Sequence, residues 1–331
     1  MEKKGIFGIG NALMDIQVFI NTELLSTFGF NKGTMQLVDA DTSARVLKGL
    51  TEYEKNCLPG GSCANTISII ASLGGQTCFL GSVSKDEYGR LYEKSLKNRG
   101  VTTCFNMNES GPTGTSIILT TEDKERTMLT NLGTCQNVMK SDVDTEVIKQ
   151  VKVFHIAGYM WDTENQKKAT LYAMEEAKKH NTLISFDIAD PFLIQRNKED
   201  FLKIIKEYVD ILFGNQDEVC QLLDTDDPRE AGRKLKDQTR ITVVKLGMNG
   251  SCVFSHDREI PISIYPTEAV DTTGAGDSYA GGFLYGFVEN HDLEKCGHMA
   301  SLIASHIVSR AGLDLSAINP DEIKTRIIQG K

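Results

Sequence analysis

From residue 141 onward, short apolar runs alternate with helical patterns, and this alternation constrains the fold more than any other feature of the sequence. Strand-like runs lie at 151–156, 183–187, 209–213 and 241–246, and predicted helices precede them at 141–150, 164–180, 199–207 and 227–237. Strands that alternate with helices form a parallel sheet covered on both faces. We therefore predict an α/β fold with a doubly wound, mainly parallel sheet. Its ligands should bind beyond the carboxyl ends of the strands, where Asp187 and Asn215 lie.

Two segments in the first half of the chain do not fit this repeat. Apolar residues alternate within 14–38, and within 104–131 two alternating runs flank the charged tetrapeptide 122–125. The second pattern is typical of a β-hairpin. Because a hairpin inserted between βα units does not belong to a parallel sheet, we expect 14–38 and 104–131 to form a small β-sheet lid. The 331 residues then make one domain, 1–331, with this addition.

Charge, hydropathy and cysteine content narrow the functional class. The net charge is −9 and no basic block occurs, so the electrostatic footprint of a nucleic-acid-binding protein is absent. The first four residues lead directly into a strand-like segment at 5–10, without a signal peptide or long apolar span. The eight cysteines are scattered and mostly lie in apolar runs, which is typical of reduced thiols. We expect a cytoplasmic monomer or homodimer that binds small molecules, not nucleic acids or membranes.

The run from Val270 to Phe283 reads Val-Asp-Thr-Thr-Gly-Ala-Gly-Asp-Ser-Tyr-Ala-Gly-Gly-Phe and opens a helix predicted over about 275–289. The first N–H groups of a helix have no internal partner and lie at the positive end of its dipole, which makes an anion site. Asp277 lies in the same turn. A carboxylate there would repel phosphate, but it could accept the proton of a hydroxyl that attacks a phosphoryl group. Alternatively, Asp277 only caps the helix.

These fourteen residues resemble the C-terminal signature of the PfkB, or ribokinase-like, family of carbohydrate and nucleoside kinases. The resemblance implies a ribokinase-like fold. It also implies that Gly274, Ala275 and Gly276 stabilise the transferring phosphoryl group and that Asp277 is the catalytic base.

A second motif, Gly60-Gly61-Ser62-Cys63-Ala64-Asn65, resembles the N-terminal signature of the same family. It implies that Gly60, Gly61 and Asn65 contact hydroxyls of the sugar. From the residues alone, Ser62 is an N-cap and Asn65 lies on the solvent face of a helix.

A third motif, Asn215-Gln216-Asp217-Glu218, follows a strand and opens a helix. On spacing alone, Asn215 and Glu218 form a capping box. In the family, an Asn-x-x-Glu at this place organises Mg²⁺ and the phosphates of ATP, in part through water, and such oxygen ligands suit Mg²⁺. ATP and Mg²⁺ are therefore the implied cofactors.

The segment 243–250 is similar to the family's strand and glycine turn under the ATP phosphates, but Lys245 replaces the usual Thr or Ser. Lys245 either pairs with phosphate or points to solvent. Gly247 and Gly250 are implied to contact ATP, although two glycines after a strand also suit a hairpin turn. The helix predicted at 292–311 carries small residues, which is typical of tight packing. In the family this helix lines the adenine pocket, with Ser301 at a contacting position.

Some relatives also bind a monovalent cation such as K⁺ beside the anion turn. The matching positions are Asp271, Thr273, Ile307, Arg310, Gly312 and Ser316.

Together these motifs imply ATP-dependent phosphorylation of a primary hydroxyl on a ribofuranose acceptor. Asn11 and Asp15 follow the first strand and are candidates to bind vicinal hydroxyls, although an Asp after a strand is also a common turn residue. The motif around Asp15 and that around Ser301 are more similar to the adenosine kinase branch than to ribokinase or fructokinases, so a nucleoside such as adenosine is expected. A free sugar, ribose or fructose, is the alternative. Four aromatic residues are either base-stacking or core residues: Phe19, Phe105, Tyr159 and Trp161.

Two functions of other classes are alternatives to this one. Gly8 and Gly10 after the first strand suggest a dinucleotide-binding oxidoreductase, but Leu13 stands where that fingerprint needs its third glycine. A non-catalytic sugar or nucleotide sensor on the same fold is the other alternative, and the presence of Asp277 argues against it.

Overall fold

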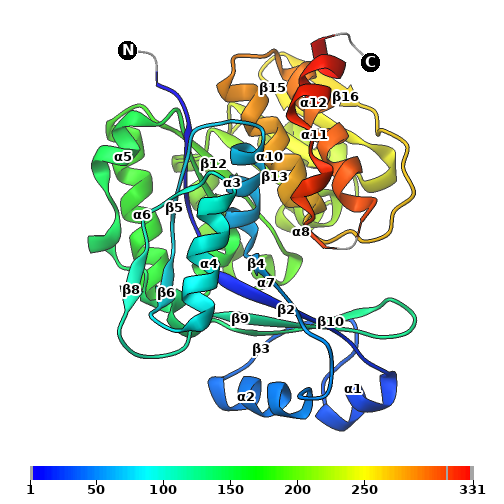
Figure 1. Cartoon of the computed structure of the whole chain (residues 1–331). Coiled ribbons are helices and arrows are strands. Elements are labelled where there is room, and N and C mark those ends of the chain that lie inside the picture. Colours follow the sequence, from blue (N-terminus) through cyan, green and yellow to red (C-terminus); the bar gives the residue numbers. More distant parts are fainter. Residues whose placement is uncertain (1–2, 311, 329–331) are drawn as a thin grey trace.

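The computed structural model describes residues 3–310 and 312–328, and a nine-stranded sheet forms the centre of the molecule (Figure 1). Its order is β16-β15-β14-β13-β12-β11-β1-β5-β7, parallel from β7 to β14, with β15 and β16 antiparallel at one edge. The strands are β1 (Ile6–Ile9), β5 (Thr77–Leu80), β7 (Thr102–Thr103), β11 (Val153–Ala157), β12 (Leu183–Asp187), β13 (Ile211–Asn215), β14 (Ile241–Lys245), β15 (Ser251–Ser255) and β16 (Arg258–Ile262). The predicted doubly wound, mainly parallel sheet is confirmed.

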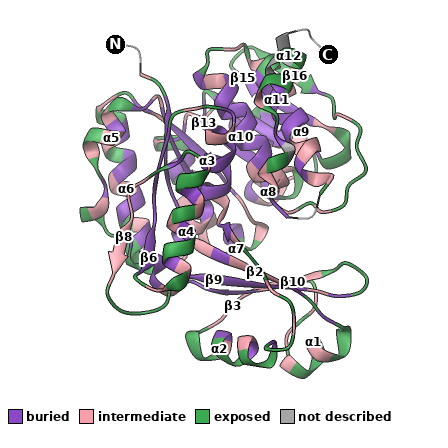
Figure 2. Ribbon diagram, viewed as in Figure 1, coloured by how far each residue is buried: buried purple, intermediate pink, exposed green. Residues whose placement is uncertain are grey.

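Helices cover both faces of this sheet, because alternate residues of each buried strand point to opposite sides. In β1, Ile6 packs into one apolar cluster, whereas Phe7 and Ile9 pack into the other. The first face carries α3 (Ser62–Ser72), α4 (Glu87–Asn98), α10 (Ala275–Val288), α11 (Leu293–Val308) and α12 (Pro320–Ile328). The second carries α5 (Thr145–Gln150), α6 (Glu164–Lys179), α7 (Pro191–Glu207), α8 (Gln216–Leu223) and α9 (Pro228–Leu235). Figure 2 shows the buried strands and α10 in purple between helices with green outer faces.

Helix α7 begins at Pro191, well before the predicted start at 199. Asp190 caps it by accepting the Phe192 amide, and Pro191 suits the first helical position. Asn197 then departs from helical geometry, with φ of −132°. The sequence pattern therefore detected only the part of α7 that follows this kink.

A second sheet lies across one end of the large sheet and has the order β3-β10-β9-β2-β4 (Figure 1). Its strands are β2 (Leu13–Phe19), β3 (Met35–Leu37), β4 (Asn56–Gly60), β9 (Thr115–Thr120) and β10 (Arg126–Asn131). The helices α1 (Thr22–Phe28) and α2 (Ala40–Gly49) cover its outer face. We call these five strands and two helices the cap.

The cap differs from the predicted lid at two places. It includes β4, which was not expected to be a strand. Conversely, β8 (Asn106–Asn108), within the segment 104–131, pairs with β6 (Ser82–Ser84) in a separate two-stranded sheet. Among the described residues, no helix is long and apolar enough to cross a bilayer.

Candidate active site

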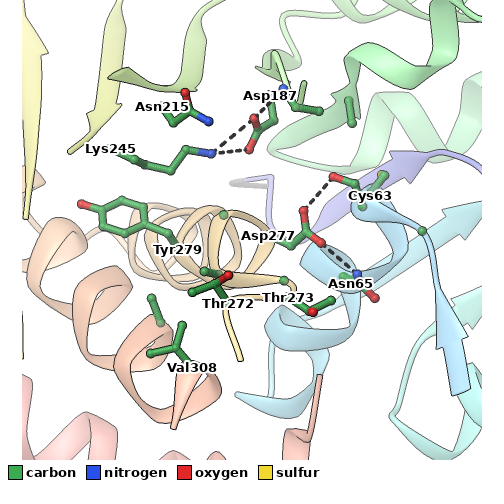
Figure 3. A pocket seen from close by; sticks show the side chains of 18 of the residues that line it. Cys63, Asn65, Asp187, Asn215, Lys245, Thr272, Thr273, Asp277, Tyr279 and Val308 are labelled. Atoms are coloured by element: carbon green, nitrogen blue, oxygen red, sulfur yellow. Dashed lines mark hydrogen bonds and ion pairs between the residues drawn. The ribbon is translucent and has the colours of Figure 1, made fainter. Parts of the chain in front are cut away.

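A cavity of about 700 Å³ lies between the cap and the carboxyl ends of the large sheet. Strands β2, β3, β9 and β10 of the cap, the ends of β11 to β14, and parts of α3, α10 and α11 supply its wall. Figure 3 shows a close view of the side that holds Asp277, Asn65, Lys245 and Asp187. This is the place at which a doubly wound sheet is expected to bind ligands.

The first turn of α10 lies against this cavity. Gly274 is the N-cap in the left-handed region, with φ of 71°, which favours glycine. The Ala275 amide bonds to the Thr272 carbonyl at 3.2 Å, whereas within the described residues no acceptor is found for the amides of Gly276 and Asp277. Two unpaired N–H groups at the positive end of a helix suit an anionic ligand.

Asp277 is held by two donors from the start of α3. Its Oδ1 accepts the Ser62 hydroxyl at 2.7 Å, and its Oδ2 accepts the Asn65 amide at 2.8 Å (Figure 3). Burial raises the pKa of Asp277 to about 6, against the lowering effect of these two hydrogen bonds. A carboxylate with this pKa is mostly ionised at neutral pH and is a competent proton acceptor.

The two α3 residues correct the predictions from local spacing. Ser62 is not the N-cap, because Gly61 takes that position with φ of 94° and makes no side-chain cap. Asn65 is not on a solvent face, since only 8 % of it is exposed. Both side chains instead point at Asp277, more than 200 positions away in the chain.

Asp15 projects its carboxylate from β2 into the cavity. A side chain at Gly60 on the neighbouring strand β4 would overlap the carboxylate, so the glycine leaves room for Asp15 in this position. No hydrogen bond to the Asp15 carboxylate is found within residues 3–310 and 312–328, and burial, then the charge of Asp277, raises its pKa to about 7. Arg126 opposes this rise. Such a carboxylate is available to accept hydrogen bonds from a ligand in the cavity.

Around Asp15 the cap contributes mainly apolar side chains to the cavity wall. These are Leu13, Met35, Leu37, Ile118 and Met128, and Leu132 directly after β10 adds to them.

Lys245 points into the cavity rather than to bulk solvent. Its Nζ lies 3.1 Å from Oδ2 of Asp187 (Figure 3), and a Cβ on Gly276 would lie 3.1 Å from the same nitrogen. Burial lowers the pKa of Lys245, but the charges of Asp187 and Glu218 outweigh it and raise the pKa overall. A fixed ammonium group therefore faces the first turn of α10.

Asn215 and Glu218 form the capping box that their spacing predicts. The Glu218 carboxylate accepts the backbone and side-chain N–H groups of Asn215 at 2.7 and 2.8 Å, and Asn215 Oδ1 accepts the Glu218 amide at 2.9 Å. Glu218 is 2 % exposed, and burial raises its pKa to about 7. Both residues still line the cavity, so water bound to Mg²⁺ could reach them without breaking the box.

The remaining nucleotide candidates lie at the far end of the cavity. Gly250 has φ of 82°, and a side chain there would meet the Ile262 carbonyl, so only glycine fits the turn after β14. Ser301 donates to the Ser263 carbonyl at 2.9 Å, and Gly247 also lines the wall.

The cavity brings together most of the predicted site residues but not all of them. It is lined by Asn11, Asp15, Gly61, Asn65, Asn215, Glu218, Lys245, Gly247, Gly250, Thr273, Gly274, Ala275, Gly276, Asp277 and Ser301. Outside its wall lie Gly60, Asp271, Ile307, Arg310, Gly312 and Ser316. Of the four aromatic candidates, only Tyr159 lines it. Trp161 packs on Phe186 and Phe201, Phe105 packs on Phe79 and Tyr92, and Phe19 is 75 % exposed.

The Asp271 carboxylate is already engaged at the proposed cation position. It accepts the Thr273 hydroxyl at 2.6 Å and the Gly312 amide at 2.8 Å, and it pairs with Arg126 at 2.9 Å. Within the described part of the chain, no cluster of three or more His, Cys, Asp or Glu side chains is arranged to hold a metal. The predicted site for a monovalent cation relied on the backbone carbonyl groups of this loop and not on side chains.

Three charged residues of the cavity were absent from the predicted set, Arg126, Asp162 and Asp187. Asp187 could have been predicted as a cavity residue, because it lies at the carboxyl end of a predicted strand. Arg126 is a cation on an apolar alternating strand, and this could have marked it as a cavity residue.

Comparison with known proteins identifies the family of the chain. The family model described as pfkB family carbohydrate kinase matches residues 40–320. The solved structure of adenosine kinase from Sinorhizobium meliloti superposes with a TM-score of 0.89 and is 32 % identical over 100 % of both chains. A probable sugar kinase from Rhizobium etli CFN 42 gives 0.89 and 31 %, covering 100 % of this chain and 99 % of its own. A 5-dehydro-2-deoxygluconokinase from Geobacillus kaustophilus is 30 % identical over 76 % of this chain and 78 % of its own.

Proposed function

Because the chain belongs to the pfkB family of carbohydrate kinases, we propose that it transfers the γ-phosphoryl group of ATP to the primary hydroxyl of a nucleoside such as adenosine. The observation that carries the acceptor assignment is the unpaired Asp15 carboxylate beside an apolar cap surface. A ribose cis-diol would supply the missing donors to Asp15. A nucleobase would cover the apolar side chains of the cap and remove them from water. A free sugar carries hydroxyls around its ring and would not provide such an apolar contact.

In the proposed reaction, Asp277 accepts the proton of the attacking hydroxyl. Ser62 and Asn65 fix the orientation of the carboxylate, and each of its oxygens keeps a second lone pair for the substrate. The amides of Gly276 and Asp277 offset the charge that develops on the phosphoryl oxygens.

Lys245 supplies the main positive charge on the other side of the phosphates. Its ammonium faces the α10 turn, and Asp187 holds it there. Asn215 and Glu218 would hold Mg²⁺ through water, and the ion would neutralise phosphate charge. The turn with Gly247 and Gly250 and the α11 residue Ser301 would surround the rest of the nucleotide.

On the acceptor side, Asn11, Gly61 and Asn65 lie with Asp15 around the sugar. The cap covers this part of the cavity and would exclude water that could hydrolyse ATP. A monovalent cation bound by the loop carbonyls near Thr273 and Gly312 would steady the anion turn, as a further part of this proposal.

The test is a steady-state comparison of adenosine, 2′-deoxyadenosine, ribose and fructose with ATP and Mg²⁺. We expect adenosine to be the best acceptor and the deoxynucleoside to be weaker. Asp15→Ala should weaken acceptor binding and narrow the gap between ribo- and deoxyribonucleoside, with little change in the KM for ATP. Asp41→Ala, which removes an exposed carboxylate from the cap helix α2, is the matched control.

Turnover of ribose or fructose without turnover of adenosine would refute the nucleoside assignment and favour a free-sugar kinase. Absence of ATP consumption with every acceptor would favour a non-catalytic binding protein.

A further inference from the structure

Two thiols lie in contact at the edge of the large sheet that β7 forms. Cys78 is on β5, and Cys104 follows the edge strand β7, which pairs with β5. Their sulfur atoms are 2.8 Å apart, and the Cys104 amide bonds to the Phe79 carbonyl at 2.9 Å. Neither residue lines the active-site cavity.

The surroundings of the two thiols differ, although all eight cysteines are free. Cys78 is 8 % exposed, whereas Cys104 is partly exposed at the margin of the second apolar cluster. The hydrogen bond between the two thiols lowers the pKa of Cys104 to about 7, against burial and the nearby carboxylate of Asp144, and it raises the pKa of Cys78. An accessible thiol with thiolate character, next to a second, resolving thiol, is the arrangement of redox-sensitive cysteines.

We propose that Cys78 and Cys104 are a redox-responsive pair that peroxide converts reversibly to an intramolecular disulfide. The Cys104 thiolate attacks one oxygen of hydrogen peroxide, the O–O bond breaks, and Cys104 sulfenic acid and hydroxide form. The Cys78 thiol then attacks the sulfenic sulfur, and the S–S bond forms as water leaves. In sum, two thiols are oxidised and one peroxide is reduced to two waters.

No other thiol offers this combination of access and a neighbouring sulfur. Cys57 is exposed, and Cys220 is partly exposed, but neither has a sulfur partner among the described contacts. The others, Cys63, Cys135, Cys252 and Cys296, are buried. The proposed modification is therefore selective, and it does not depend on the identity of the phosphoryl acceptor.

The test uses the full-length, reduced protein and hydrogen peroxide. Thiols titrated after denaturation should fall from eight to six and return to eight with dithiothreitol. Non-reducing gels should show a monomer, which excludes a link between molecules through Cys57.

Peptide mapping identifies the bond. A tryptic peptide covering 56–85 holds Cys57, Cys63 and Cys78 together, so a second cleavage, after Leu73, is needed to assign the linked sulfur. The expected cross-link joins residues 78 and 104. It should be lost in Cys78→Ser and in Cys104→Ser and kept in Cys57→Ser.

The disulfide should also raise the midpoint of thermal unfolding, because it joins residues that are 26 positions apart. Eight thiols remaining after peroxide, or a link between any other two cysteines, would overturn the proposal. So would irreversible oxidation of Cys104 alone, since Cys78 would then not act as its partner. All three results are measured with the wild-type protein, so they do not depend on whether the variants fold.

Discussion

Replacing Asp15 with Asn should stabilise the protein at alkaline pH even as it impairs binding of the acceptor. The Asp15 carboxylate has no hydrogen-bond partner among the described residues, and its pKa is raised from 3.8 to about 7, first by burial and then by Asp277. Its ionised form therefore disfavours the folded state. Asn has nearly the same shape and no charge, so Asp15→Asn removes this destabilisation.

The size of the effect follows from the pKa. A rise from 3.8 to about 7 corresponds to about 4 kcal/mol between the two protonation states. Because the side chain faces a cavity that admits solvent, we expect about 2–4 kcal/mol in the free energy of unfolding. The size of the gain depends on pH. Between about pH 4 and 7 the folded protein holds a proton on Asp15 that the unfolded chain has released, so stability from this group is lost as pH rises. The gain from Asp15→Asn should be near zero at pH 4 and largest above about pH 7.

Urea unfolding at pH 5, 7 and 8.5 measures this difference. Trp161 is the single, buried tryptophan, and its fluorescence can be compared with circular dichroism to check that unfolding is two-state. Asp41→Asn, on the exposed surface of α2, controls for a general change in charge. A variant that is less stable than the wild type at pH 8.5, or a difference that does not change with pH, would refute the reasoning.

Three further predictions concern the catalytic step. Asp277→Asn should lower kcat by ~10²–10⁴-fold with ATP binding retained, and the wild-type kcat/KM should fall below about pH 6 as Asp277 is protonated; near-normal turnover would leave Asp277 as a helix cap only. Glu218→Gln should raise the Mg²⁺ concentration required for half-maximal activity, whereas an unchanged Mg²⁺ titration would favour a purely structural capping box. Lys245→Met should lower kcat/KM for ATP by ~10–100-fold, the usual effect of a charge-assisted hydrogen bond. If the double variant with Asp187→Asn recovers activity, Lys245 only neutralises Asp187.

The sequence was most informative where a pattern of apolar residues repeats over a long stretch of the chain. The alternation from residue 141 onward predicted the large sheet, because each strand is buried on both faces and each helix has one apolar side. The sequence did not predict the strand β4, because a proline such as Pro59 argues against a strand. The structure accommodates the proline because β4 is an edge strand of the cap sheet.

Contacts between distant residues were the part of the site that local spacing could not provide. Ser62 resembles an N-cap in its own segment, and its bond to Asp277 depends on the packing of α3 against α10. The ion pair of Lys245 and Asp187 likewise requires the order β12-β13-β14, which places the ends of these strands together. For Asn215 and Glu218 the local prediction of a capping box was right, and what remains a proposal is their part in holding Mg²⁺.

The packing of α10 on α3 also determines when, during synthesis, the active site can exist. About 200 residues of chain separate the end of α3 from the start of α10. At ~5–20 residues per second a ribosome needs roughly 10–40 s to make them. Throughout this interval Ser62 and Asn65 lack the carboxylate that they hold in the finished protein, and the apolar face of α3 lacks its cover. A nascent chain should therefore be catalytically silent and most in need of a chaperone until α10 leaves the exit tunnel.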